Sequence, residues 1–237
     1  MMTSCIRKEN SSVSASINYI SSNQAEMCGA IYRFKRFGRG GGIVKFFVGG
    51  LHGDECEQTR PILERLAREC ASHLSFFGDA VILPCLVERD RHVSVLREEY
   101  YRMEAGRRLL SLVRFLHPRF YFEIHSYGMH SLSRLTSAKR FEIEGVPPFV
   151  ELERGILIGS ISPILRKEFQ RDAFCLTVEI PKWHGDAVKA RVLAILRACL
   201  AAESRDALLK ALRRMYPEQM RKAEELFRMF YTEIEPF

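Results

Sequence analysis

IVKFFVGGLHGDE, residues 43–55, is the stretch that decides the fold of this chain. Its first six residues form an apolar run that predicts a strand. The glycine pair that follows lets the backbone turn tightly where this strand ends. His52 and Glu55 come directly after the turn, three positions apart. A histidine and a carboxylate at this spacing can bind one metal ion, although the spacing alone does not specify a site.

A second apolar stretch, FYFEIH, ends at His125. In an open α/β sheet the carboxyl ends of parallel strands meet at one edge, where ligands bind, so His125 is expected to lie beside the first motif. Two histidines and one carboxylate suit zinc, and three protein ligands leave a fourth position for water, as in catalytic sites. The sequence therefore predicts one zinc ion per chain, held by His52, Glu55 and His125.

A third strand-like run, FCLTVEIP, places Glu179 among apolar residues shortly before Pro181. A buried carboxylate is costly unless it is paired or used, and proline ends a strand. We expect Glu179 to lie near the strand end and to act as a general base. Its task would be to take a proton from the water that the zinc makes acidic.

Three motifs occur in a set order: GGLHGDE at 49–55, EIHSY at 123–127 and TVEI at 177–180. Together they resemble the signature of the zinc carboxypeptidase superfamily, and more closely its succinylglutamate desuccinylase and aspartoacylase branch. Within that branch the chain is similar to an archaeal family found mostly in methanogens. The resemblance covers residues 30–185. It implies the same three zinc ligands, with Glu179 as the catalytic glutamate.

The chain departs from the family pattern after its next strand. Members usually carry an Asn-Pro pair there, followed by arginines that bind the substrate carboxylate, whereas this chain has Leu83 before Pro84. A guanidinium group pairs bidentately with a carboxylate, so we expect Arg91, and next Arg89, to bind the substrate. Tyr127 is a further candidate for contact with the substrate.

Strand-like and helix-like segments alternate, which predicts an α/β fold with a mixed or mostly parallel sheet flanked by helices. Residues 1–12 are expected to be flexible and residues 13–237 to form a single domain, with a helical part at 186–231. The glycine-rich run 38–42 is expected to close a hairpin between a strand at 30–37 and the strand at 43–48. Residues 98–117 predict one long helix, and 128–148 predict a loop over the site.

Composition narrows the class of protein. The formal net charge is +7, but basic and acidic residues are interleaved, which favours solvated helix faces over a nucleic-acid interface. No signal peptide or membrane span is evident, and we expect a cytoplasmic protein. None of the seven cysteines forms a Cys-x-x-Cys pair, and free thiols are expected. The pattern does not indicate an oligomeric state.

These features together predict a zinc-dependent hydrolase that cleaves an amide bond of a small N-acyl amino acid or related carboxylate. A metallocarboxypeptidase acting on peptides uses the same chemistry, but the short chain leaves little room for an extended peptide groove. A third hypothesis is a catalytically silent metal-binding protein that binds an acidic partner or RNA. The missing Asn-Arg pattern is the feature that favours it.

Overall fold

The computed structural model describes most of the chain from residue 34 onward. The described residues are 17–18, 34–38, 40, 42–72, 75–183, 185–234 and 236–237. The expected flexible segment 1–12 lies outside them, as do residues 30–33 of the strand expected at 30–37. No helix in the described ranges is both long and apolar enough to cross a membrane.

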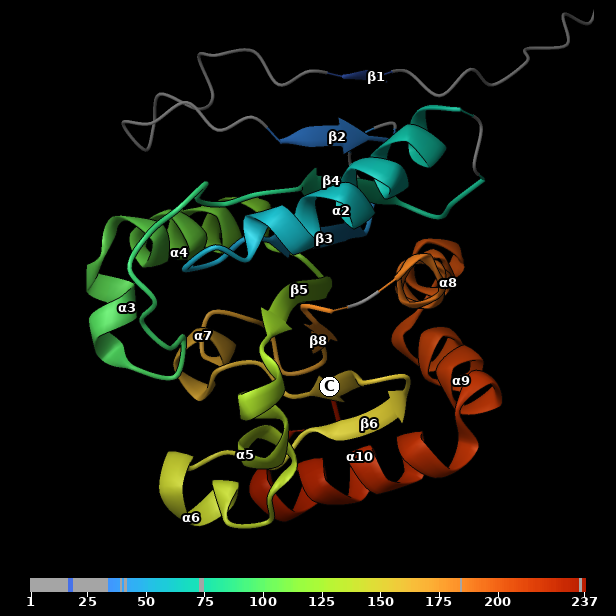
Figure 1. Ribbon diagram of the computed structural model, residues 1–237. Coiled ribbons are helices and arrows are strands. Elements are labelled where there is room, and N and C mark those ends of the chain that lie inside the picture. Colours follow the sequence, from blue (N-terminus) through green and yellow to red (C-terminus); the bar gives the residue numbers. More distant parts are fainter. Residues whose placement is uncertain are drawn as a thin grey trace, which may run out of the picture.

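The described strands form one mixed sheet (Figure 1). Their order across it is β1-β2-β4-β3-β5-β8-β7-β6. The four central strands β4, β3, β5 and β8 are parallel, and the outer strands pair antiparallel. The mixed sheet flanked by helices confirms the expected fold class. The strands are β1 (Ile17–Asn18), β2 (Lys35–Phe37), β3 (Val44–Gly49), β4 (Asp79–Leu83), β5 (Phe120–Tyr127), β6 (Val150–Glu153), β7 (Ile156–Gly159) and β8 (Phe174–Pro181).

Helices cover both faces of the sheet (Figure 1). One face carries α2, α8, α9 and α10, and the other carries α3, α4 and α7. The short helices η2, α5 and α6 follow β5. The bounds are α2 (Cys56–Ala71), α3 (Glu98–Arg102), α4 (Glu104–Leu116), η2 (Met129–Ser131), α5 (Leu132–Thr136), α6 (Arg140–Glu144), α7 (Pro163–Arg166), α8 (Asp186–Ala201), α9 (Arg205–Met215) and α10 (Pro217–Phe230).

Burial on both faces explains why the central strands are apolar runs rather than alternating patterns. Phe46 and Phe47 are neighbours on β3, point to opposite faces and are both fully buried. Phe47 belongs to the core under α2 and α8, and Phe46 belongs to the core under α4. The two cores hold the parallel strands in register, so the positions of their carboxyl ends are fixed.

Two expectations about local structure are wrong. The segment 98–117 is not one helix, because Met103 is extended and separates α3 from α4. A side chain at Gly106 would lie within 2.1 Å of the Tyr100 carbonyl oxygen, so only glycine permits this close return of the chain. The glycine-rich run does not close a hairpin either, because β2 pairs with β4 rather than with β3.

The cysteine expectation is correct in part. Cys70, Cys175 and Cys199 are free and buried, as expected for small apolar residues. Cys56 and Cys85, however, form a disulfide with Cα atoms 5.3 Å apart, so the expectation of free thiols is wrong for this pair. Cys56 begins α2, which follows β3, and Cys85 lies in the turn after β4. Because β3 and β4 are adjacent and parallel, these two segments meet at the same edge of the sheet, where the disulfide forms.

Lys45 is a fully buried cation on β3 that caps a helix from a distant part of the chain. Its Nζ donates to the carbonyl oxygens of Cys199 at 2.9 Å, Leu200 at 2.7 Å and Ala202 at 2.5 Å. These carbonyls lie at the C-terminal end of α8, where a positive charge is favourable. Burial lowers the pKa of Lys45 to about 8, while the three acceptors match the three protons of the ammonium group.

Replacing this cation is expected to destabilise the fold strongly. Lys45→Met keeps the apolar stem but leaves three helix-end carbonyls without their donor, and the free energy of unfolding should fall by roughly 2–4 kcal/mol. Urea denaturation of the variant measures this. Lys210→Met on the exposed side of α9 is the control and should change the value by less than about 0.5 kcal/mol. Equal midpoints for the two variants would contradict the capping role.

Candidate functional site

The site lies where β3, β5 and β8 end. Gly49 of β3 is paired with Ile124 of β5, so the loop after β3 begins beside His125. His125 in turn is directly opposite Glu179 of β8. The next strand in the chain, β4, pairs with one side of β3, and β5 pairs with its other side. Connections that leave a strand edge in opposite directions create the crevice where open α/β sheets bind ligands.

The loop after β3 is held in one conformation by its backbone. Gly50 and Gly53 have φ values of +62° and +59°, which favour glycine. A Cβ at Gly50 would also lie 3.0 Å from the Cβ of Cys56. The turn after β4 supports the loop, since Leu86 N donates to Gly49 O at 2.8 Å and Val87 N to Gly50 O at 3.0 Å. The loop therefore presents His52 and Glu55 in fixed positions.

His52, Glu55 and His125 form a compact buried cluster. Each offers one ligand atom, and these atoms lie within 4.8 Å of one another. His52 Nδ1 is 3.6 Å and His125 Nδ1 is 3.2 Å from Glu55 Oε1. The backbone N of Ser126 also donates to Glu55 Oε1 at 3.3 Å. The structure thus brings together the three residues that the sequence predicts as metal ligands.

The hydrogen bonding of the cluster is incomplete. His52 Nδ1 and Glu55 Oε2 are buried and form no hydrogen bond, although buried polar atoms are normally paired and His125 Nδ1 lies 3.2 Å from Oε2. Burial lowers the pKa of His52 to about 4, which leaves its ring neutral and able to bind a metal. Burial also opposes charge on His125, but Glu55 and Glu123 raise its pKa well above the usual value. The donor set fits a metal ion.

Glu123 lies behind His125 on the same face of β5. Its Oε1 is 3.5 Å from His125 Nε2, on the side of the ring away from Glu55. Tyr121 donates its hydroxyl to Glu123 at 3.0 Å, and Thr177 donates at 2.7 Å. This buried carboxylate is therefore fixed by its own hydrogen bonds and fixes the orientation of the His125 ring.

Glu179 faces the same cavity from β8. Its side chain is partly exposed, but Oε2 is buried and lacks a hydrogen-bond partner. Burial raises the pKa of Glu179 to about 7, with smaller opposing influences from the positive charges of His125 and Arg140. A carboxyl group with a pKa near neutrality is well matched to proton transfer.

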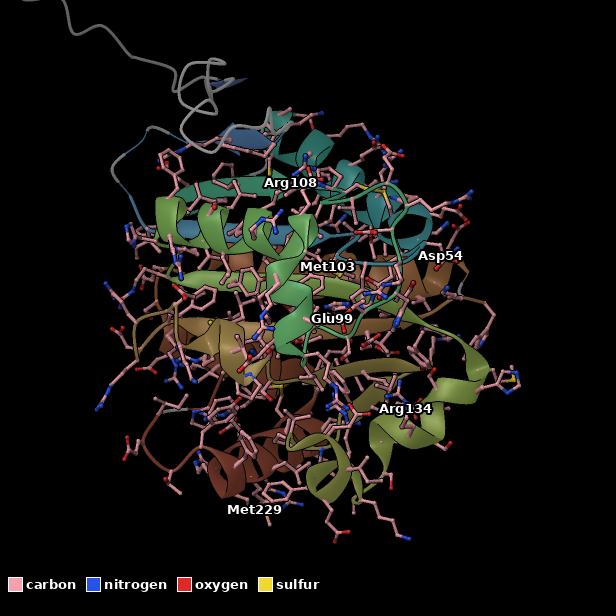
Figure 2. All side chains as sticks on the ribbon, turned by 90° about the vertical axis from the view of Figure 1, so that its left-hand side faces the viewer. Asp54, Glu99, Met103, Arg108, Arg134 and Met229 are labelled. Atoms are coloured by element: carbon pink, nitrogen blue, oxygen red, sulfur yellow. A yellow bond between two sulfur atoms is a disulfide. The ribbon has the colours of Figure 1, made fainter. Side chains whose placement is uncertain are left out.

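The cavity in front of these residues has a volume of about 270 Å³. The segment 128–148, expected to be a loop, instead contains η2, α5 and α6, and it does overhang the site as expected. Figure 2 shows Arg134 of α5 and Asp54 of the loop after β3 on the same side of the molecule. The residues of this segment that line the cavity are Gly128, Ser131, Arg134, Leu135, Arg140 and Glu144.

The expected substrate-binding arginines lie elsewhere. Arg91 is exposed and pairs with Glu99, and Arg89 is exposed and pairs with Glu57 at 3.1 Å. Neither lines the cavity, because the turn after β4 directs both side chains outward to carboxylates of α3 and α2. The structure therefore does not bring these two arginines into the site.

Tyr127 does line the cavity, but its hydroxyl donates to the Gly155 carbonyl at 2.6 Å. The arginine and lysine residues that line the cavity are Arg134, Arg140 and Lys182, none of which the sequence reasoning selected. Lys182 already pairs with Asp54 at 2.5 Å. The sequence did contain a signal for Arg134 and Arg140, because both lie in the segment after His125 that was expected to overhang the site.

Comparison with known proteins decides the family. Residues 40–232 match the family described as "Uncharacterized protein conserved in archaea (DUF2119)". The chain belongs to this family. A relative from Methanocaldococcus jannaschii, described as "Uncharacterized protein MJ0501", is 39% identical over 197 residues. The match covers 82% of this chain and 92% of that protein. These findings confirm the archaeal family that the sequence motifs resemble.

The chain is also similar to two solved structures. One is an aspartoacylase family protein from Mesorhizobium loti, with 15% identity and a TM-score of 0.44 over 71% of this chain. The other is the succinylglutamate desuccinylase from Chromobacterium violaceum, with 12% identity and a TM-score of 0.42 over 73% of this chain. The chain spans 61% and 66% of the lengths of these two proteins, less than two thirds of each.

Proposed function

We propose that this chain is a zinc-dependent hydrolase that cleaves an amide bond of a small N-acyl amino acid or related carboxylate. One zinc ion per chain would be held by His52, Glu55 and His125. The observation that carries the proposal is a buried group of two histidines and a glutamate with unpartnered atoms, next to Glu179 in one cavity. The donor types match those of three-ligand catalytic zinc sites.

The chemistry follows from the positions of the side chains. When bound, a zinc ion supplies Lewis acidity that polarises a carbonyl group and makes water more acidic. Glu179 would accept a proton from the attacking water and then donate it to the nitrogen of the leaving amine. Its pKa of about 7 allows it to gain and lose that proton near neutrality. Glu123 would hold the ring of His125 throughout.

The size of the cavity supports a small substrate. A volume of about 270 Å³ is near the lower end of ligand pockets in proteins. Side chains of α5 and α6 line this cavity together with the cluster and reduce the room for an extended peptide chain. We therefore favour a deacylase over a carboxypeptidase.

A direct assay separates these functions. Zinc-loaded protein is incubated with a panel of N-acetyl and N-succinyl amino acids, and with a library of short peptides, while release of free amine is measured. The proposal predicts hydrolysis of at least one N-acyl amino acid and little release from peptides. Release from peptides alone would indicate a carboxypeptidase. Hydrolysis of neither, together with salt-dependent RNA binding, would favour the catalytically silent interpretation.

Loss of the carboxylate behind His125 is expected to weaken metal binding. Glu123→Gln keeps the shape of the side chain but removes the charge that orients the histidine ring, and zinc affinity should fall about 10- to 100-fold. Competition with a chromogenic chelator measures the affinity. Glu225→Gln, on the exposed side of α10, is the matched control and should bind zinc as the wild type does. Unchanged affinity in Glu123→Gln would contradict the orienting role.

A further inference from the structure

The disulfide between Cys56 and Cys85 adjoins the residues of the candidate metal site. Cys56 directly follows Glu55 in the chain and begins α2. Cys85 lies in the turn after β4, whose backbone donates hydrogen bonds to the end of β3 and to the loop that follows it. The bond therefore connects the start of α2, next to one candidate ligand, to the turn that supports the loop carrying His52.

The loop after β3 packs directly against the disulfide. A Cβ at Gly50 would lie 3.1 Å from Cys85 Sγ and 3.1 Å from Cys56 Cα, which is closer than most Cβ atoms approach such neighbours. A displacement of either cysteine would therefore reach the backbone that leads to His52. With the bond intact, the three candidate ligand atoms lie within 4.8 Å of one another, so the oxidised chain holds a geometry that suits a metal ion.

Exposed ion pairs also join α2 to the turn after β4, but they are weak substitutes for a covalent bond. Arg60 pairs with Glu88, and Arg89 pairs with Glu57 at 3.1 Å. Pairs of this kind contribute little to stability because water and salt screen them. The first turn of α2 also lacks a side-chain cap. Loss of the disulfide would therefore loosen the segment that positions the Glu55 carboxylate.

Cys85 is the more accessible half of the disulfide. It is half-buried, whereas Cys56 is only 3% exposed, so we expect a reductant to attack the Cys85 sulfur. The other cysteines in the described part of the chain, Cys70, Cys175 and Cys199, are buried and free. Accessible disulfides are the more readily reduced ones, and in a reducing compartment such bonds are usually transient or redox-sensing.

We propose that the disulfide between Cys56 and Cys85 is a redox switch for the metal site. The switch rests on the proposed function, because it concerns the affinity of the same three ligands for zinc. A thiolate of a dithiol reductant attacks Cys85 Sγ, the bond between the two cysteine sulfurs breaks, and Cys56 takes up a proton. The second thiol of the reductant then releases Cys85, so the chain gains two electrons and two protons while the dithiol becomes a disulfide. Reduction frees the start of α2, with Glu55, and lowers the affinity for zinc.

The zinc affinities of the oxidised and the reduced chain test the switch. Protein is oxidised with glutathione disulfide or reduced with dithiothreitol, freed of reagent without air, and titrated with zinc against a chromogenic chelator. Alkylation followed by mass spectrometry of peptides reports the thiols at Cys56 and Cys85 in each state. The oxidised form should bind zinc about 3- to 30-fold more tightly than the reduced form, a fraction of what a disulfide contributes to stability.

Matched variants separate the effect of the bond from that of the thiols. The double variant Cys56→Ser, Cys85→Ser can neither form the bond nor offer a thiol to zinc. It should bind zinc as weakly as the reduced wild type and should not respond to either reagent. Cys70→Ser removes a buried thiol outside the disulfide, and as the control it should keep the wild-type response. The comparison of oxidised with reduced wild type stands even if the double variant does not fold.

The outcomes separate this proposal from the proposed function. If the oxidised and reduced wild type bind zinc equally, or if the reduced form binds it more tightly, the switch is wrong while the metal site stands. Free thiols at Cys56 and Cys85 after treatment with glutathione disulfide also overturn the switch. If neither form binds zinc, the metal site and the switch are both wrong.

Discussion

Glu179→Gln is expected to reduce hydrolysis of the best N-acyl amino acid by about 10²- to 10⁴-fold, the range typical of a lost general base. Glutamine has nearly the same shape as glutamate but cannot accept the proton of the attacking water. Since Glu179 does not belong to the cluster of His52, Glu55 and His125, zinc content should remain that of the wild type. Initial rates and zinc content of the same preparation are the two measurements.

Two features make this variant informative. The carboxyl group that it removes has an unpartnered Oε2, so the fold loses no hydrogen bond at that atom. A melting temperature near that of the wild type is therefore expected, and it would exclude unfolding as the cause of lost activity. Glu225→Gln serves again as the exposed control. Full activity in Glu179→Gln would contradict the assigned mechanism.

The positions of the candidate ligands could be predicted from sequence because they depend on local patterns. Apolar runs indicate where β3, β5 and β8 lie. His125 and Glu179 are two residues before the ends of their strands, and His52 and Glu55 follow the end of β3. That β5 and β8 are neighbours, with His125 opposite Glu179, is seen only in the structure. Strand ends are predictable in this way wherever both faces of a parallel sheet are buried.

The remaining features depend on contacts between distant segments. The pairing of β2 with β4 is decided partly by Asp79, which binds Arg36 at 2.8 Å, and no local pattern encodes that choice. The disulfide between Cys56 and Cys85 likewise requires two loops to meet. The break at Met103 depends on the close return of Gly106 to Tyr100.

The direction of a side chain is harder to predict than its position in the chain. Arg91 follows the strand at which the family carries its carboxylate-binding residues, yet Glu99 of α3 draws its side chain outward. Arg140 lies in a segment with little periodicity, yet it lines the cavity with its guanidinium group 4.4 Å from the centre of the Phe149 ring. The lining of the cavity therefore requires the structure, whereas the candidate metal ligands could be predicted from the sequence.

The central claim is that His52, Glu55 and His125 hold a metal ion. His52→Ala removes one of three ligands and leaves an incomplete set, so zinc retention should fall severely. His130→Ala is the matched control, because His130 is exposed and lies outside the cluster.

The most direct measurement is the zinc content of purified protein after exposure to zinc and removal of the unbound ion. The account predicts about one zinc per chain in the wild type and in His130→Ala, and almost none in His52→Ala. A wild type without zinc, or a His52→Ala variant with as much zinc as the wild type, would contradict it.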